Sequence, residues 1–291
     1  MNLILHIILM LLSVALFTLF ERKVLGLIQL RKGPCKVGPL GLLQPFSDAL
    51  KLFSKFSSAP MKGNFLLYYF TPLYFLILSL IFFLNKPFLS SSFFTLSILI
   101  LLFLYTTSVY TTLVTGWSSN SKYSLIGSMR SIAQSLSYEI TLGLLFYGFA
   151  FVMSTTLMYK IMNFNTLFLQ LFYWPFSLIL FLNYLIESNR TPFDLSECES
   201  ELVSGFNVEF GGAEFSLIFL GENLMLVFNS LVLSFFIGSI SLYLIFWIII
   251  IFIKVSIRGA YPRYRLDSMM ELCWLTFLPL IIILLSSLFM I

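Results

Sequence analysis

Long apolar runs alternate with shorter polar stretches along the whole chain. Window hydropathy predicts membrane-spanning helices at about 3–20, 66–84, 93–115, 131–157, 167–186, 215–236, 238–257 and 274–291. Each run approaches or exceeds the roughly 20 apolar residues that a helix needs to cross a bilayer. The run from Phe215 to Ile253 has 39 residues, which is too long for one span, so Gly238 is the expected turn. The pattern predicts an all-α integral membrane protein with about eight transmembrane helices, and residues 1–291 form a single membrane domain.

The stretch between the first two spans has a different periodicity. Apolar residues recur there at helical spacing, with polar residues between them, over residues 41–56. This pattern predicts an amphipathic helix that lies in the plane of the membrane interface. Two roles remain open for it: simple anchoring, or framing an opening for a lipid-like molecule.

Charge and composition strengthen the membrane assignment and orient the chain. The sequence is 59% hydrophobic and 10% charged, whereas soluble domains carry about 25% charged residues. Most of the seventeen Lys and Arg residues lie in four polar stretches: eight in 21–65, two in 116–130, one in 187–214 and four in 254–273. Because basic loops stay on the inner side, these stretches are the predicted inner loops, and both termini face outward.

The third inner loop is densely acidic. Residues 187–214 hold seven of the thirteen carboxylates and one base, Arg190. Thr191-Pro192-Phe193-Asp194 is typical of a helix start, which would place Asp194, Glu197 and Glu201 on one helical face. Carboxylates that lie close together away from water cannot all ionise easily. The face is therefore a proton-handling device if it is buried, or an ordinary polar face if it is exposed.

Two carboxylates lie inside predicted spans. Glu139 follows polar residues in the fourth span, and Glu222 lies seven residues past the start of the sixth, about 10 Å deep at the helical rise. An ionisable group at this depth is a candidate for function, and the alternative is a structural pair with a base such as Arg130. The last inner loop carries Arg258, Arg263 and Arg265 among tyrosines. This cluster either anchors anionic lipid or neutralises the acidic loop.

Redox chemistry on a metal is not expected in this chain. It has one histidine, His6, and three scattered cysteines, Cys35, Cys198 and Cys273. A haem or an iron–sulfur cluster needs several such ligands close together. We therefore predict no metal site and no redox centre.

A set of motifs resembles the NADH dehydrogenase subunit 1 family of respiratory complex I. The matching pieces are ERKVLG at 21–26, RKGP at 31–34, GLLQPFSDALKLFSK at 41–55, GWSSNSKYSLIG at 116–127, SYEIT at 137–141, ESNRTPFDL at 187–195, ESELVSGFNVEF at 199–210 and YPRYR at 261–265. They span nearly the whole chain in the family's order, and the long acidic motif is highly specific.

The resemblance implies a core membrane subunit of proton-translocating NADH:ubiquinone oxidoreductase that carries no redox cofactor itself. By position, the ubiquinone tunnel or its mouth would be lined by Arg22, Arg31, Asp48, Phe206 and Arg265. The acidic proton or coupling path would be formed by Glu139, Glu187, Asp194, Glu197, Glu201, Glu209 and Glu222.

The same resemblance implies the surroundings of the subunit. Ubiquinone would be the substrate, and NADH, FMN and iron–sulfur clusters would be held by partner subunits. The partners would be the quinone-site subunits of the peripheral arm, the small and antiporter-like membrane subunits and phospholipids, but no nucleic acid. The location would be the mitochondrial inner membrane with both termini on the intermembrane-space side, and a bacterial plasma membrane is the alternative.

Two other functions are consistent with an eight-span protein. A secondary transporter would show internal repeats and paired discontinuous helices, and neither is found. A purely structural anchor for a soluble complex would explain the inner loops but not Glu139 and Glu222.

Overall fold

A computed structural model describes residues 2–85, 96–152, 167–195, 205–238 and 242–289, and these residues form helices and connecting turns without a strand. The long helices are α1 (Asn2–Ile28), α3 (Phe65–Leu84), α4 (Ser97–Ser118), α5 (Lys122–Val152), α7 (Leu167–Glu187), α9 (Gly212–Ile237) and α10 (Tyr243–Ala260). The shorter elements are η1 (Pro39–Gly41), α2 (Gln44–Phe53), η2 (Gly205–Asn207), α11 (Leu266–Glu271), the π-helical turn η3 (Leu272–Phe277) and α12 (Leu278–Phe289).

Each predicted span coincides with a helix, so the all-α membrane fold is confirmed. Within the described residues, six helical segments are long and apolar enough to cross a membrane: α1, α3, α4, α9, α10 and the continuous stretch from α11 to α12. The helices α5 and α7 coincide with the two remaining predicted spans. The turn expected at Gly238 is also found, because α9 ends at Ile237. The exact number of spans stays a prediction.

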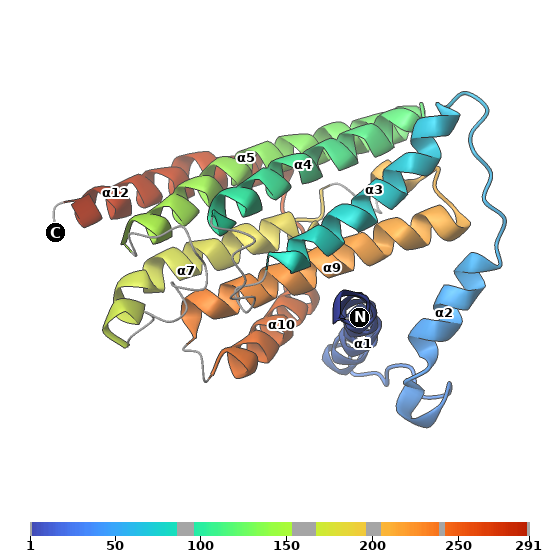
Figure 1. The fold of residues 1–291 in the computed structure, drawn as a ribbon, viewed down its shortest axis with the longest axis horizontal. Helices are drawn as coiled ribbons and strands as arrows, with labels where there is room; N and C mark the ends of the chain where they lie inside the picture. The colour runs from blue at the N-terminus through green and yellow to red at the C-terminus, as the bar shows by residue number, and fades with distance from the viewer. Residues whose placement is uncertain (1, 86–95, 153–166, 196–204, 239–241, 290–291) are drawn as a thin grey trace.

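Helix α9 is the centre of the bundle. It contacts α1, α2, α3, α7 and α10, and Figure 1 shows it in orange between the layer of α3, α4 and α5 and the pair α1 and α10. Its most apolar stretch is 72% buried, whereas that of α10 is 17% buried. Since both sequences are strongly apolar, burial against protein rather than hydropathy distinguishes the central helix from a peripheral one.

Helix α2 is the predicted amphipathic helix. It contacts α1 and α9 but has no fully buried residue. Its apolar side chains Phe46, Leu50 and Phe53 are exposed, as expected for a face that lies against lipid. Just beyond its end the chain meets the start of α9, where a Cβ atom on Gly212 would lie 2.9 Å from the carbonyl oxygen of Lys55. Glycine therefore allows this close approach.

The helices extend beyond the apolar runs into the predicted inner loops. Only residues 119–121 separate α4 from α5, although 116–130 was the predicted loop. The polar residues of that stretch are accommodated because their hydroxyls bond to carbonyls of their own helix, as Ser118 does to Thr115 at 2.9 Å. Hydropathy marks where apolar side chains end, whereas the helix continues as long as its polar groups find partners.

The predicted helix start at Thr191 is wrong, because residues 191–195 form turns. Their polar groups bond to the last turn of α10 and to the segment that follows it instead of capping a helix. Thr191 donates its hydroxyl to the Arg258 carbonyl at 3.1 Å, and the Tyr264 amide donates to the Pro192 carbonyl at 2.8 Å. Phe193 also stacks on the Tyr264 ring, with 5.2 Å between centroids. These tertiary contacts outweigh the local preference for a helix.

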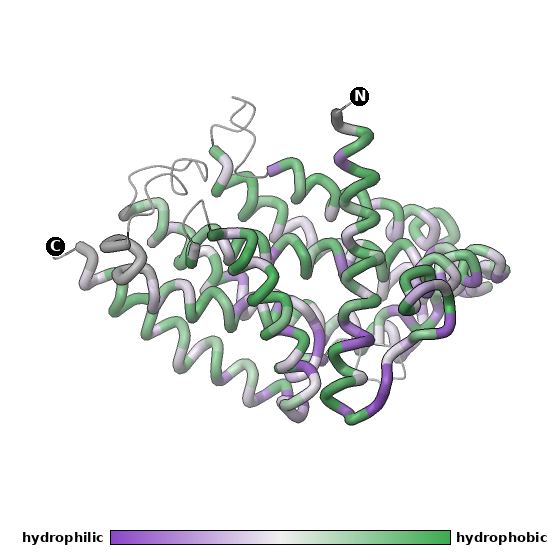
Figure 2. Tube along the Cα trace, turned by 90° about the horizontal axis from the view of Figure 1, so that it is seen from below, coloured by the Kyte–Doolittle hydropathy of each residue, from purple (hydrophilic) through white to green (hydrophobic). Residues whose placement is uncertain are grey.

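Hydrophilic residues gather toward one end of the bundle. Figure 2 shows most of the purple segments in the lower half of the view, away from the N-terminus, with the C-terminal end of α1 among them. The candidate site lies among these polar segments.

Candidate functional site

A cavity of about 350 Å³ opens beside α1 and α9. Leu25, Phe215 and Phe219 contribute apolar walls. The remaining lining residues are polar or charged: Thr18, Glu21, Arg22, Arg190, Asn207, Glu222 and Arg258. We call it the charged cavity. Its volume lies at the lower end of the roughly 300–1,000 Å³ typical of small-molecule sites.

A buried ion cluster fixes one wall of the charged cavity. The Oε1 atom of Glu21 accepts hydrogen bonds from both Arg190 and Arg258. The Glu21 side chain is 9% exposed. Arg190 also donates from Nη2 to the Oδ1 atom of Asn223 at 2.6 Å. One carboxylate therefore joins the C-terminal part of α1, the turn after α7 and the end of α10, and its charge is compensated.

A second, more exposed ion pair joins α1 to α2. Arg22 donates from Nη1 to the Oδ2 atom of Asp48, whose other oxygen accepts from Gln44 at 3.0 Å. The pair holds the amphipathic helix at the mouth of the charged cavity, because Arg22 lines it. Two of the five residues assigned to the tunnel thus contact each other.

The other tunnel candidates lie elsewhere in this subunit. Arg31 is exposed in the segment after α1. Phe206 is 2% exposed and packs with Tyr68 and Phe210, so it does not line the charged cavity. Arg265 pairs with Asp267 at 3.5 Å on the surface.

A smaller cavity of about 60 Å³ lies deeper in the bundle. Its polar lining is unusual for a membrane interior: Ser108 and Thr112 from α4, Ser131, Ser135 and Tyr138 from α5, Glu187, Ser188 and Asn189 at and after the end of α7, and Glu222 and Asn229 from α9. We call it the hydroxyl cavity. It has room for water, which needs about 10–15 Å³ and two to four polar partners.

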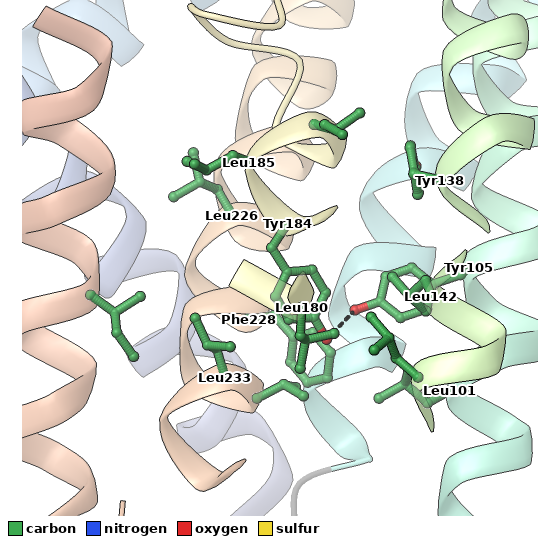
Figure 3. Packing of buried hydrophobic residues seen from close by; sticks show 14 of the residues in the cluster. Leu101, Tyr105, Tyr138, Leu142, Leu180, Tyr184, Leu185, Leu226, Phe228 and Leu233 are labelled. Atoms are coloured by element: carbon green, nitrogen blue, oxygen red, sulfur yellow. Dashed lines mark hydrogen bonds between the residues drawn. The ribbon is translucent and has the colours of Figure 1, made fainter. Parts of the chain in front are cut away.

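Glu187 is tied into a hydrogen-bonded chain beside the hydroxyl cavity. Asn229 bonds to the Glu187 carboxylate, and the hydroxyl of Tyr105 donates to Oδ1 of Asn229 at 2.7 Å. The hydroxyls of Tyr105 and Tyr184 lie 3.4 Å apart and face each other in Figure 3. The Oε2 atom of Glu187 is buried and has no hydrogen-bond partner among the described residues. This chain spans α4, α7 and α9.

Glu222 lines both cavities. It follows Gly221 on α9, whose missing side chain lets Phe75 of α3 approach closely. A carboxylate at the boundary between the two spaces is able to exchange a proton with groups or water on either side. The sequence identified Glu222 by its depth in a predicted span, and the structure shows that it lines two cavities.

The remaining acidic candidates are not gathered in one place. Asp194 is buried and pairs with Arg263 at 3.0 Å. Glu209 is exposed, and Glu139 is partly exposed on α5 and lines neither cavity. Glu197 and Glu201 lie outside the described residues. Within the described part of the chain, no group of three or more histidine, cysteine or carboxylate side chains is arranged to bind a metal ion.

Sequence reasoning missed several residues of the two cavities. It gave no site role to Glu21, Arg190 or Arg258, which form the ion cluster. It also missed Asn223 and Asn229, although two amides beside a glutamate in an apolar helix were a usable signal, because a buried polar group needs a partner. No local sequence signal identifies Tyr105, because its hydrogen-bond partner, Asn229, comes from α9.

Comparison with known proteins supplies the family. A family model described as NADH dehydrogenase matches residues 1–289. The chain is 45% identical over 286 residues to NADH-ubiquinone oxidoreductase chain 1 of Aedes aegypti, covering 95% of this chain and 90% of the relative. The same-named proteins of Didelphis virginiana (293 residues; 96% and 92% covered) and Branchiostoma lanceolatum (295 residues; 96% and 91% covered) are 40% and 38% identical.

These matches confirm the resemblance found in the motifs and favour it over the transporter and the structural anchor. They extend over the full helical bundle rather than one motif. The chain belongs to the NADH dehydrogenase family and is a membrane subunit of NADH:ubiquinone oxidoreductase, respiratory complex I.

Proposed function

We propose that the charged cavity is part of the membrane portion of the ubiquinone tunnel and that the hydroxyl cavity begins the proton path. The observation that carries this proposal is that Glu222 lines both cavities. The mixed lining of the charged cavity suits a quinone, because its apolar wall packs on an isoprenoid tail and its polar wall faces the ring oxygens. Helix α2, with its exposed apolar face, flanks the entrance from the lipid.

The residues of this chain would transfer protons and would not carry electrons. In the proposal, NADH, FMN and iron–sulfur clusters are held by partner subunits of the peripheral arm, which deliver the electrons to ubiquinone. The guanidinium groups of Arg22, Arg190 and Arg258 stabilise the negative charge that develops on the quinone oxygens during reduction. Glu222 then passes a proton between the charged cavity and the hydroxyl cavity.

The path continues from Glu222 through the hydroxyl cavity to Glu187. Hydroxyls of Ser108 and Ser135 donate to carbonyls three residues earlier in their own helices, at 2.7 and 2.9 Å. Their oxygens remain available to accept hydrogen bonds from water. A short water-filled space bounded by two carboxylates is a suitable proton conduit. Arg31, Arg265, Glu139 and Glu209, which are at least partly exposed, would contribute at contacts with partner subunits. Phe206 and Asp194 are buried and would act by shaping this chain, and Glu197 and Glu201 stay predicted members of the acidic path.

In this proposal, the subunit lies in the mitochondrial inner membrane with both termini on the intermembrane-space side. It lies beneath the peripheral arm and next to the small and antiporter-like subunits. Phospholipids cover its exposed apolar helices.

A Glu222→Gln variant of the assembled complex tests the proton path. The amide keeps the size of the side chain but cannot carry the proton, so proton translocation per NADH oxidised should fall strongly. Assembly on native gels and NADH oxidation with an artificial acceptor should be unchanged. Glu139→Gln should have a smaller effect, since Glu139 lines neither cavity, and Glu271→Gln, an exposed carboxylate, serves as the control. Normal pumping by Glu222→Gln would rule the path out.

A photoreactive quinone analogue tests the tunnel. Cross-linking in isolated membranes followed by peptide mapping should label residues 21–56 or 199–222, because these segments contain Arg22, Phe219 and other lining residues of the charged cavity. Labelling confined to other segments would contradict the tunnel assignment.

A further inference from the structure

Lys254 is a buried cation on an otherwise apolar helix. It lies on α10 and is 6% exposed. Its neighbours Phe252 and Ile253 are exposed, so Lys254 lies on the face of α10 that is turned into the protein. The Nζ atom has no hydrogen-bond acceptor among the described residues. A buried ammonium without a partner is destabilising by several kcal/mol, so its presence calls for a compensating group.

The groups that face Lys254 belong to the Glu187 chain. Its Nζ atom lies 5.5 Å from the centroid of the Tyr184 ring, a cation–π contact. Glu187 follows Tyr184 by three residues on the same helix and interacts electrostatically with Lys254. Its Oε2 atom also lacks a hydrogen-bond partner within the described part of the chain. A cation and an anion, each incompletely paired, therefore interact beside one aromatic residue, Tyr184.

The surroundings of Glu187 leave Lys254 as its counter-charge. The other ionisable groups near it are the phenols of Tyr105 on α4, Tyr138 on α5 and Tyr184 on α7, which are neutral at pH 7. Glu139 acts on Tyr138, and Glu222 shares the hydroxyl cavity. Among the described residues, Lys254 is the base that acts electrostatically on Glu187.

We propose that Lys254 is a positioning residue of the proton path, whose ammonium, lying over the Tyr184 ring, favours the charged form of the Glu187 carboxyl group. The inference rests on the proposed function and adds a residue that neither the motifs nor the family resemblance assigned. The charged Lys254 favours the carboxylate form of Glu187, which accepts a proton from the hydroxyl cavity, and so opposes burial, which favours the neutral acid. Without the ammonium, the neutral acid is favoured further, and Glu187 accepts a proton less readily.

The test is a double-mutant cycle in the assembled complex. Lys254→Met removes the charge but keeps an unbranched side chain, so assembly on native gels should be unchanged. Proton translocation per NADH should fall clearly, because the neutral acid is then favoured at Glu187. In a Glu187→Gln background, Lys254→Met should cause no further loss, because the two groups act as one unit. Lys254→Arg, which keeps the charge, should restore most of the pumping, and Ile248→Met on the exposed face of α10 is the control.

A second measurement reads the charge of Glu187 directly. The carbonyl stretch of a protonated carboxyl, assigned by its loss in Glu187→Gln, should grow in infrared spectra of Lys254→Met. This measurement needs folded complex but no turnover.

The outcomes separate the two proposals. Loss of pumping in Glu222→Gln together with normal pumping in Lys254→Met overturns the role of Lys254 and leaves the path intact. The role of Lys254 is also overturned by additive losses in the double mutant or by equal defects in the Met and Arg variants. It is overturned as well if the Met variant fails to assemble or if the carboxyl band is unchanged. Normal pumping in both Glu222→Gln and Glu187→Gln overturns the path and this inference with it.

Discussion

Glu21 and Glu187 are both carboxylates with buried oxygens near the C-terminal ends of apolar helices, and they line different cavities. Glu21 accepts from two arginines and is fully compensated. Glu187 is bonded by an amide, and one of its oxygens has no hydrogen-bond partner within the described residues. A carboxylate held by two guanidinium groups has a fixed charge and joins helices. A carboxylate held by neutral groups and a more distant ammonium is able to change its protonation. Glu21 is therefore suited to a structural role and Glu187 to proton transfer.

The largest expected effect is on stability, at Glu21. Glu21→Gln removes the carboxylate charge that Arg190 and Arg258 share, and breaking a buried ion cluster in this way costs about 3–5 kcal/mol. The amount of assembled complex on native gels and its half-life at elevated temperature should fall sharply, whereas Glu187→Gln should assemble normally. If both variants assemble equally well, the contrast between a structural and a functional carboxylate is lost.

An intermediate effect is expected where α9 meets α3. In Gly221→Ala the new Cβ atom would lie 2.4 Å from Cδ1 of Phe75, a residue that lines the hydroxyl cavity. The ring must shift, at about 1–3 kcal/mol, and the cavity beside Glu222 changes shape. Pumping should fall more than quinone affinity, measured as the KM for ubiquinone.

Gly143→Ala is the matched control for this prediction, because a Cβ there meets nothing within 4 Å. Alanine is favoured over glycine in a helix by about 1 kcal/mol, so thermal stability should hold or rise. An equal loss of pumping in both variants would show that the hydroxyl cavity is not the sensitive region.

The smallest effect is expected at the exposed pair of Arg22 and Asp48, whose side chains are 48% and 35% exposed. Arg22→Gln should change thermal stability by less than about 1 kcal/mol. The difference from the wild type should shrink further in high salt, because ions screen exposed charges. Thermal inactivation at two salt concentrations measures this, and a loss as large as that of Glu21→Gln would show that the pair is not a surface contact in the assembled complex.

Much of the fold was predictable because membrane burial acts on each residue separately. Apolar runs alone located the helices, the spacing in 41–56 located α2, and a run too long for one span located the turn at Gly238. The helix ends were predicted less well, since polar groups such as the Ser118 hydroxyl find partners inside a helix and prolong it. The helix predicted to start at Thr191 was wrong because the partners of this segment come from the end of α10 and the residues after it.

The candidate site was predictable only in part. Glu222 was identified because a carboxylate within an apolar run is unfavourable without a role, and Glu187 was identified through the family resemblance. Their neighbours were not, since Glu21 meets Arg190 and Arg258 across 169 and 237 residues of sequence. The chain by itself determined its helices, its membrane environment and its family, because hydropathy and motifs are local. Only the tertiary structure decided which carboxylates are neutralised and which remain free to titrate, because that depends on which distant side chain lies within a few ångströms.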